Sequence, residues 1–320
     1  MNVLSLFDGI SCGRLALERA GISVTNYYAS EINDTAISIT QRHYPNTIQL
    51  GDVTQIDVEV LQSLPRIDLL IGGSPCQGFS RNGKTLNFND PRSALFFEYV
   101  RILNWLKTHN NPNLKFLLEN VEMKKEWEAI ITQYLGVEPV LINSKVLSCQ
   151  NRPRLYWANF NHPAIPVKEY PLSDILEEVT GDWIEEHGIK FDVTISEKSR
   201  QLVINKGTHL QIKQATKKGY IEAHEGDGVN LSFPTSKTRR GRVIKGKSNT
   251  LDCSCAGWVY HKGIIRPYTI NELEQLQTLP IGYTEGISLK DRKHAIGNGW
   301  TVNVIAHLFN GLRGEGFETL

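Results

Sequence analysis

Short apolar runs alternate with helical periodicity along the first half of the chain. Residues 3–7 and 67–71 are apolar runs of strand length, and residues 114–118 form another. Residues 14–19 and 93–106 have the spacing of helices that pack one face on a core. Strands that alternate with helices are typical of a parallel sheet covered on both faces. The pattern therefore predicts an α/β fold.

This alternation degrades beyond about residue 165. The following hundred residues are rich in Lys, Gly and Ser and contain few long periodic segments. Helical periodicity returns only at residues 270–279 and 302–312. We therefore predict three parts, which are a large core at 1–165, a separate small domain at 166–265, and a segment at 266–320 that returns to the core.

Composition is that of an ordinary soluble protein. Hydrophobic residues make up 40% of the 320 positions and charged residues 22%, and no apolar run is long enough to span a bilayer. The short apolar stretch after Met1 has no basic region before it, so it predicts a core strand and not a secretory signal. We expect a cytoplasmic protein with no membrane partner.

The five cysteines are odd in number and form no CxxC pair. This argues against a disulfide framework and against a four-thiolate zinc site. Cys253 and Cys255 form a CxC pair without partners at zinc-finger spacing, and we expect them to be strand residues. We predict no metal.

Basic charge is concentrated in one segment. The net charge is +1, but residues 205–247 contain ten Lys or Arg and three acids, which gives +7 there and 1 − 7 = −6 elsewhere. Such a distribution favours an anionic partner such as nucleic acid. A solvated basic surface is the alternative.

A glycine-bearing turn follows the first apolar run. Phe7, Asp8, Gly9 and Gly13 lie in a segment that could let a nucleotide approach the backbone, and Glu31 follows Gly9 by 22 residues, where an acid could bind ribose hydroxyls. The strict GxGxxG is absent, so an ordinary turn of an α/β protein explains these residues about equally well.

The loop after residues 67–71 contains the most informative cysteine. Cys76 follows Pro75 in a polar, glycine-rich loop directly after a buried strand. Most single cysteines are small buried hydrophobes, but burial suits a strand or helix interior better than this loop. We therefore favour an exposed nucleophile.

Two acids complete this sheet edge. Glu119 follows the run 114–118 and should reach the edge where Cys76 lies, although an ordinary strand-end hydrogen bond is the simpler role. Asp52 follows Gly51 and could accept from an adenine amino group, but a helix or turn cap explains it more simply.

These motifs together resemble the cytosine-C5 DNA methyltransferase family over nearly the whole chain, in the family's order. The N- and C-terminal segments are most similar to the catalytic domain of eukaryotic de novo DNA methyltransferases. One departure is Gly297-Asn298-Gly299-Trp300, where many bacterial members have Gly-Asn-Ser-Val. The matching segments are Phe7-Asp8-Gly9 with Gly13, Glu31, Asp52, Ser74-Pro75-Cys76-Gln77, Glu119-Asn120-Val121, Gln150-Asn151-Arg152-Pro153-Arg154 and Gly297-Asn298-Gly299-Trp300.

The resemblance implies a doubly wound, Rossmann-like methyltransferase core with a smaller target-recognition domain. It also implies methyl transfer from S-adenosyl-L-methionine to cytosine C5 through a covalent bond between Cys76 and C6. Glu119 would stabilise the ring at N3, and Arg152 and Arg154 would approach the cytosine carbonyl, the catalytic loop or DNA. The alternative for Arg152 and Arg154 is that they are merely an exposed pair of residues on a strand.

The same resemblance implies a set of cofactor-binding residues. Phe7 would contact adenine, Glu31 the ribose and Asp52 the adenine amino group, while Trp300 would close the pocket from the C-terminal segment. The full set is Phe7, Asp8, Gly9, Ile10, Gly13, Glu31, Ile32, Asp52, Val53, Asn298 and Trp300.

The implied partner is double-stranded DNA, from which the target base is rotated out of the stack. Phosphate and base contacts would come from Ser80 and Arg81 and from the basic run, in which Lys245 and Lys247 also lie. The expected DNA-binding set is Ser80, Arg81, Lys237, Arg239, Arg240 and Arg242. A restriction endonuclease partner is compatible with this function, and the sequence leaves the DNA site and oligomeric state open.

Three rival functions stay open at this point. The same chemistry on tRNA is the nearest, although the Cys-Phe-Thr signature of that branch is not evident. A catalytically silent DNA-binding homologue would keep the fold but has no need of Cys76, Glu119 and Arg154. A Rossmann-type oxidoreductase would explain the nucleotide turn alone.

Overall fold

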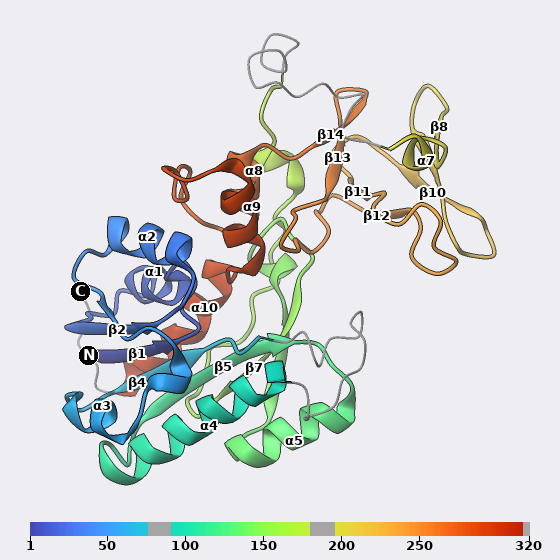
Figure 1. The fold of residues 1–320 in the computed structure, drawn as a ribbon. Coiled ribbons are helices and arrows are strands. Elements are labelled where there is room, and N and C mark those ends of the chain that lie inside the picture. The colour runs from blue at the N-terminus through green and yellow to red at the C-terminus, as the bar shows by residue number, and fades with distance from the viewer. Residues whose placement is uncertain (76–90, 180–195, 316–320) are drawn as a thin grey trace. The chain divides into compact units, whose positions relative to one another are not determined.

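The computed structural model describes residues 1–75, 91–179 and 196–315. The chain forms two compact units. Figure 1 shows the fold, with the colour running from blue at the N-terminus to red at the C-terminus. The first comprises Met1–Asn143, Pro153–Ile165 and Gly299–Leu320, and the second comprises Ser144–Arg152 and Pro166–Asn298. No helix in the described part of the chain is long and apolar enough to cross a bilayer.

A seven-stranded sheet forms the centre of the first unit, in the order β3-β2-β1-β4-β5-β7-β6. The strands from β3 to β5 run parallel, whereas β7 is antiparallel to both of its neighbours. The α/β prediction is confirmed, with this antiparallel strand added. The strands are β1 (Asn2–Leu6), β2 (Asn26–Ser30), β3 (Ile48–Gln49), β4 (Leu69–Gly72), β5 (Lys115–Val121), β6 (Pro139–Asn143) and β7 (Pro153–Ala158).

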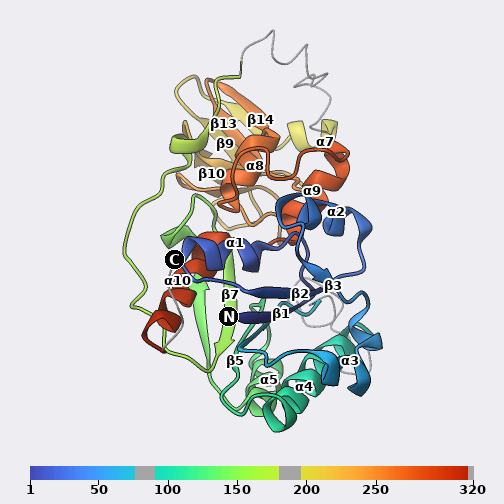
Figure 2. The same cartoon turned by 90° about the vertical axis from the view of Figure 1, so that its left-hand side faces the viewer.

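Helices cover both faces of this sheet. Figures 1 and 2 show α1 and α10 on one face and α4 and α5 on the other. Phe96 and Leu103 of α4 belong to the same buried cluster as Leu4, Leu70 and Phe116 of the strands. The helices are α1 (Cys12–Arg19), α2 (Asp34–His43), α3 (Val58–Ser63), α4 (Pro91–His109), α5 (Lys125–Leu135) and α10 (Val302–Phe309), with short 3-10 turns η1 (Val53–Gln55) and η4 (Asn310–Glu315).

The second unit contains two small antiparallel sheets around a core that includes Ile212, Val229 and Trp258. One has the order β10-β9-β8 and the other β12-β11-β13-β14. Its elements are η2 (Ser144–Val146), η3 (Leu172–Ile175), α7 (Glu197–Arg200), β8 (Val203–Asn205), β9 (Leu210–Lys213), β10 (Tyr220–Ala223), β11 (Gly228–Asn230), β12 (Arg242–Ile244), β13 (Trp258–His261), β14 (Ile264–Pro267), α8 (Ile270–Leu276) and α9 (Leu289–Asn298).

Helix α8 begins at a capping box that is joined to a buried ion pair. The Thr269 side chain accepts from the Glu272 N–H, and the Glu272 carboxylate accepts from the Thr269 N–H. Arg266 donates to both oxygens of Glu272, at 2.6 and 2.8 Å. The cap fixes the first turn of α8, and the ion pair ties it to β14.

The compact units divide the C-terminal segment differently from the sequence prediction. Helix α10 belongs to the first unit, as expected for a segment that returns to the core, but α8 and α9 belong to the second. Periodicity identifies these helices without indicating which core they bury. The functional assignments of the regions 1–165, 166–265 and 266–320 stay predictions.

Candidate active site

The strand order of the first unit indicates where a ligand should bind. Strands β2 and β3 lie on one side of β1, whereas β4 and β5 lie on the other. Ligands of open α/β sheets bind outside the carboxyl ends of the strands where the order reverses in this way. The segments that begin at Phe7 and Gly73, after β1 and β4, therefore border the expected site.

The segment after β1 is an irregular turn held by Glu31. Phe7, Gly9 and Ser11 all have left-handed backbone conformations, with φ of 57°, 60° and 56°. One Glu31 oxygen accepts from the Gly9 N–H at 2.8 Å, and the other accepts from the Ile32 N–H at 2.9 Å. Glu31 therefore ties the turn after β1 to the end of β2.

Asp8 points inward from this turn. Its carboxylate accepts hydrogen bonds from the hydroxyls of Ser11 and Tyr27. Burial raises the pKa of Asp8 to about 6 despite these hydrogen bonds. The side chains of Ile10 and Val53 are buried. The contacts expected of Asp8, Ile10 and Val53 with the cofactor stay predictions.

Asp52 is a cap. It precedes η1, and its carboxylate accepts from the Thr54 N–H at 2.9 Å. The simpler alternative that the sequence offered is therefore confirmed. Capping occupies one oxygen and leaves the second, so the adenine contact stays a prediction.

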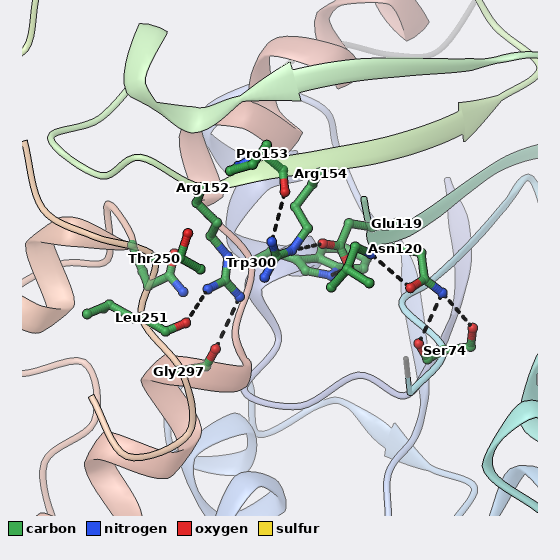
Figure 3. Close-up of polar contacts among 12 residues, drawn as sticks. Ser74, Glu119, Asn120, Arg152, Pro153, Arg154, Thr250, Leu251, Gly297 and Trp300 are labelled. Atoms are coloured by element: carbon green, nitrogen blue, oxygen red, sulfur yellow. Dashed lines mark hydrogen bonds and ion pairs between the residues drawn. The ribbon is translucent and has the colours of Figure 1, made fainter. Parts of the chain in front are cut away.

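Glu119, Arg154 and Trp300 converge at the sheet (Figure 3). The Arg154 Nε lies 3.0 Å from Glu119 Oε1, and the Trp300 indole nitrogen donates to Oε2 at 3.2 Å. The side chains of the ion pair are only 14% and 12% exposed, so their attraction is weakly screened by water. Pairing of β5 with β7 brings the two charges together, because Val121 lies opposite Arg154.

Asn120 ties the segment after β4 to the strand that carries Glu119. Its buried amide donates to the Ser74 carbonyl at 3.4 Å and to the Ser74 hydroxyl at 3.3 Å. Ser74 is two residues before Cys76 in the sequence. Cys76, Ser80 and Arg81 lie outside the described residues.

Arg152 belongs to the second unit and has backbone partners there (Figure 3). Its guanidinium donates to the carbonyls of Leu251 at 2.7 Å and Gly297 at 3.1 Å. Arg152 is 5% exposed, and the Arg154 side chain is also largely covered, so the alternative of an exposed strand pair is wrong. A catalytic role for Arg152 stays a prediction.

A family model for C-5 cytosine-specific DNA methylases matches residues 1–313. The chain belongs to this family. Enzymes of the C-5 cytosine methylase family generally depend on S-adenosylmethionine. The family match is in accord with the resemblance found in the sequence.

Individual relatives are similar at modest identity. Orphan methyltransferase M.SPRI of Bacillus phage SPR is 33% identical over 195 residues, which cover 56% of this chain and 43% of the relative. Type II methyltransferase M.NlaX of Neisseria lactamica is 34% identical over 173 residues, which cover 50% of this chain and 53% of the relative. The matched part of this chain therefore spans about half the length of these relatives.

The fold is shared with solved structures. A DNMT2 variant from Spodoptera frugiperda superposes with a TM-score of 0.62 at 20% identity, covering 98% of this chain and 99% of the other. The doubly wound core expected from the sequence is confirmed by this likeness, which extends over both units of the chain.

The cations expected to contact DNA differ in their surroundings. Lys237 and Arg242 are exposed. The Arg239 guanidinium lies 4.5 Å from the centre of the Phe233 ring, and Arg240 donates to the Gln214 carbonyl at 3.3 Å. Contacts of these four cations with DNA stay predictions.

Lys247 is not placed for phosphate binding, in contrast to the expectation for the basic run. It is buried, and its ammonium donates to the carbonyls of Lys145, Ser148 and Tyr170 at 2.6 to 3.1 Å. Burial lowers its pKa. Lys247 therefore joins segments of the second unit, a role that positive charge in the sequence does not distinguish from phosphate binding.

Two of the described cysteines, Cys149 and Cys255, are poor candidates for a nucleophile. Burial raises the pKa of Cys149 to about 11 and that of Cys255 to about 12, which keeps both as thiols. The expectation of strand residues at Cys253 and Cys255 is wrong, since both lie in a turn before β13. Cys253 donates to the side chain of Asn298, a residue of the expected cofactor set.

Two glycines have roles that the sequence did not reveal. A Cβ on Gly73 would lie 2.9 Å from the Trp300 indole nitrogen and 3.2 Å from Glu119 Oε2. A Cβ on Gly13 would lie 3.4 Å from the far edge of the same indole. The nearest neighbour of a Cβ on Gly13 would be the Ile71 side chain. The paired glycines at the end of β4 were a visible signal in the sequence, but the indole that excludes a side chain at Gly73 lies more than 200 positions away.

Proposed function

We propose that this protein is a DNA (cytosine-5-)-methyltransferase, which transfers a methyl group from S-adenosylmethionine to C5 of a flipped-out cytosine in duplex DNA. The observation that carries the proposal is the Glu119–Arg154 pair, beside which Asn120 holds the segment that leads to Cys76. A carboxyl group at this sheet edge, acting together with the thiol of Cys76, would suit nucleophilic addition to a ring that gains negative charge.

The residues around the turn after β1 fit S-adenosylmethionine. Glu31 offers carboxylate oxygens to the ribose hydroxyls, and Ile32 beside it is 73% exposed, which suits an apolar contact with the adenine face. The left-handed turn brings the Gly9 backbone to the same edge. The full cofactor set proposed from the sequence includes Asn298 and Trp300, and the cofactor would supply an electrophilic methyl group on its sulfonium.

Cys76, as a thiolate, would add to cytosine C6 and make C5 nucleophilic. Glu119, as a carboxylic acid, would donate to N3 and stabilise the charge that the addition places on the ring, while Arg154 would fix the Glu119 carboxyl group. After C5 has gained the methyl group, loss of the C5 proton and elimination of the Cys76 thiolate would restore the aromatic ring. Arg152 would also be catalytic, approaching the cytosine carbonyl oxygen, the catalytic loop or DNA.

The second unit would bind the DNA while the base is out of the stack. Its exposed cations Lys237 and Arg242, together with Arg239 and Arg240, would contact phosphates or base edges. Ser80 and Arg81 would contact DNA from the loop that carries Cys76. We further propose that the enzyme acts in the cytoplasm, where a restriction endonuclease could accompany it, as the Type II designation of the relative M.NlaX suggests.

The decisive experiment is transfer of labelled methyl from S-adenosylmethionine to duplex DNA and to tRNA, followed by bisulfite mapping of the DNA. Wild type should label DNA cytosine, and Cys76→Ala should abolish transfer because the variant lacks the thiolate that would add to C6. Cys149→Ala is the matched control, since it removes a buried thiol of raised pKa from the second unit.

Each outcome has a distinct meaning. DNA labelling that disappears in Cys76→Ala and persists in Cys149→Ala supports the proposal. Preferential labelling of tRNA would overturn the substrate, and transfer that survives Cys76→Ala would overturn the mechanism. Absence of transfer to either substrate would indicate a catalytically silent homologue.

A further inference from the structure

Trp300 lies between the two segments that border the site. The far edge of its indole faces Gly13 at the start of α1, and its nitrogen faces Gly73 after β4, because a Cβ at either glycine would come within 3.4 Å of the ring. All three residues belong to the first unit. The indole therefore spans from the turn proposed to bind the cofactor to the strand that carries Glu119.

The polar end of this indole meets one acceptor among the residues that the structure describes. Its N–H donates to Glu119 Oε2 at 3.2 Å (Figure 3). An indole can only donate, so Oε2 must act as an acceptor there. Arg154 binds the other oxygen at 3.0 Å. With a donor on each oxygen, the carboxylate cannot rotate without losing one of the two contacts.

The Gly73 backbone completes the arrangement. A side chain at this position would collide with the indole nitrogen and approach Glu119 Oε2 at 3.2 Å. The hydrogen bond between Trp300 and Glu119 is therefore packed against the segment that leads to Cys76. A chain with Gly-Asn-Ser-Val in place of Gly297-Asn298-Gly299-Trp300 has no indole donor for this contact.

We propose that Trp300 is a positioning residue for Glu119, in addition to any contact that it makes with the cofactor. Its N–H fixes the plane of the Glu119 carboxyl group that is to contact cytosine N3. Its ring lies against Gly13 at the start of α1 and so links this helix to Glu119. This inference rests on the function proposed above, because the orientation of Glu119 affects a reaction rate only if the protein catalyses methyl transfer.

The test replaces the indole donor and keeps an aromatic ring. Trp300→Phe should lower kcat roughly tenfold, as expected for one hydrogen bond to a charged group. KM for S-adenosylmethionine should change less than about threefold, since the ring contact is retained. In the Glu119→Gln background Trp300→Phe should have little further effect on kcat, because the two residues act as a unit.

Trp157 provides the matched control. It also belongs to the first unit, and its indole donates to the Thr132 hydroxyl at 2.9 Å. Trp157→Phe should reduce thermal stability while leaving kcat within about twofold of wild type. A kcat in Trp300→Phe equal to that of wild type, or an equal loss in the presence and absence of the Glu119 carboxylate, would overturn the proposal.

A second readout does not depend on activity. The indole N–H resonance of Trp300, assigned by its loss in Trp300→Phe, should shift in Glu119→Gln, whereas that of Trp157 should not. An unchanged Trp300 resonance would refute the contact even in an active enzyme. If the resonance shifts but wild type methylates neither DNA nor tRNA, the contact stands and the proposed function fails.

Discussion

Two arginine–carboxylate pairs in this chain differ in how completely the carboxylate is satisfied. In the second unit, Glu272 accepts four N–H groups, two from Arg266 and one each from the backbones of Glu177 and Thr269. In the first unit, the structure records one donor on each oxygen of Glu119, from Arg154 and Trp300.

This difference separates a structural pair from a site that can act on a ligand. Two carboxylate oxygens offer about four lone-pair positions in all. Glu272 is fully buried, and its four donors use these positions to join α8, β14 and the segment around Glu177. Among the described residues Glu119 has two donors, which leave lone-pair positions on its carboxylate. A proton bound at such a position would let Glu119 donate to cytosine N3, which is itself an acceptor.

Removing the saturated carboxylate should give the largest effect. Glu272→Ala would leave the Arg266 guanidinium buried without its counter-charge, which costs about 3–5 kcal/mol of unfolding free energy. Urea unfolding followed by circular dichroism would measure this loss. A change below about 1 kcal/mol would show that the pair is not structural, and Lys262→Ala, which removes an exposed ion pair with Glu178, serves as a control.

Removing the unsaturated carboxylate should affect activity more than folding. Glu119→Gln keeps the size of the side chain and loses its charge, so kcat should fall by at least about 100-fold, whereas the free energy of unfolding should change by about 1 kcal/mol. Methyl-transfer kinetics and urea unfolding of the same preparation would check this. Severe destabilisation with normal kcat in the surviving folded fraction would reverse our distinction between the two pairs.

Asp8 is a third carboxylate to compare with Glu272 and Glu119, and its hydrogen bonds come from the hydroxyls of Ser11 and Tyr27 and not from a guanidinium. Its pKa is raised from 3.8 to about 6 by burial. Between pH 4 and 6 the folded protein holds a proton that the unfolded chain releases, so this group makes stability fall as pH rises through that range.

Asp8→Asn should remove this dependence. The variant should be more stable than wild type at pH 7.5 by up to about 3 kcal/mol, since one pKa unit corresponds to about 1.4 kcal/mol, and the gain should vanish near pH 4. Thermal unfolding at both pH values would measure it. A gain of equal size at pH 4 and 7.5 would contradict the assignment to Asp8.

The sequence predicted the parallel part of the fold because that part depends on local periodicity. The run at 114–118 became β5, and Glu119 was placed correctly at the sheet but wrongly after the strand, which extends to Val121 through pairing with β7. The sequence pattern does not reveal that β7 is antiparallel, since alternation of polar and apolar residues is independent of strand direction.

The site was predictable only as far as its residues follow strand ends or match family motifs. Glu31 meets both conditions, whereas Glu119 lies inside β5 and is identified by its motif. The partners of Arg152 are 99 and 145 positions away, and they follow from packing that no local signal encodes. The hydrogen bond from Trp300 to Glu119 spans 181 positions and is equally invisible in the sequence.

The way in which the second unit is assembled limits how its specificity could be exchanged by engineering. Cys149 and Asn151 from its short first segment hydrogen-bond the backbone of Ser248, and the Gln150 amide reaches the Leu276 carbonyl. A graft of 166–298 alone into another scaffold would lack these partners. A transplantable recognition module must therefore carry residues 144–152 as well, although they precede it in the chain.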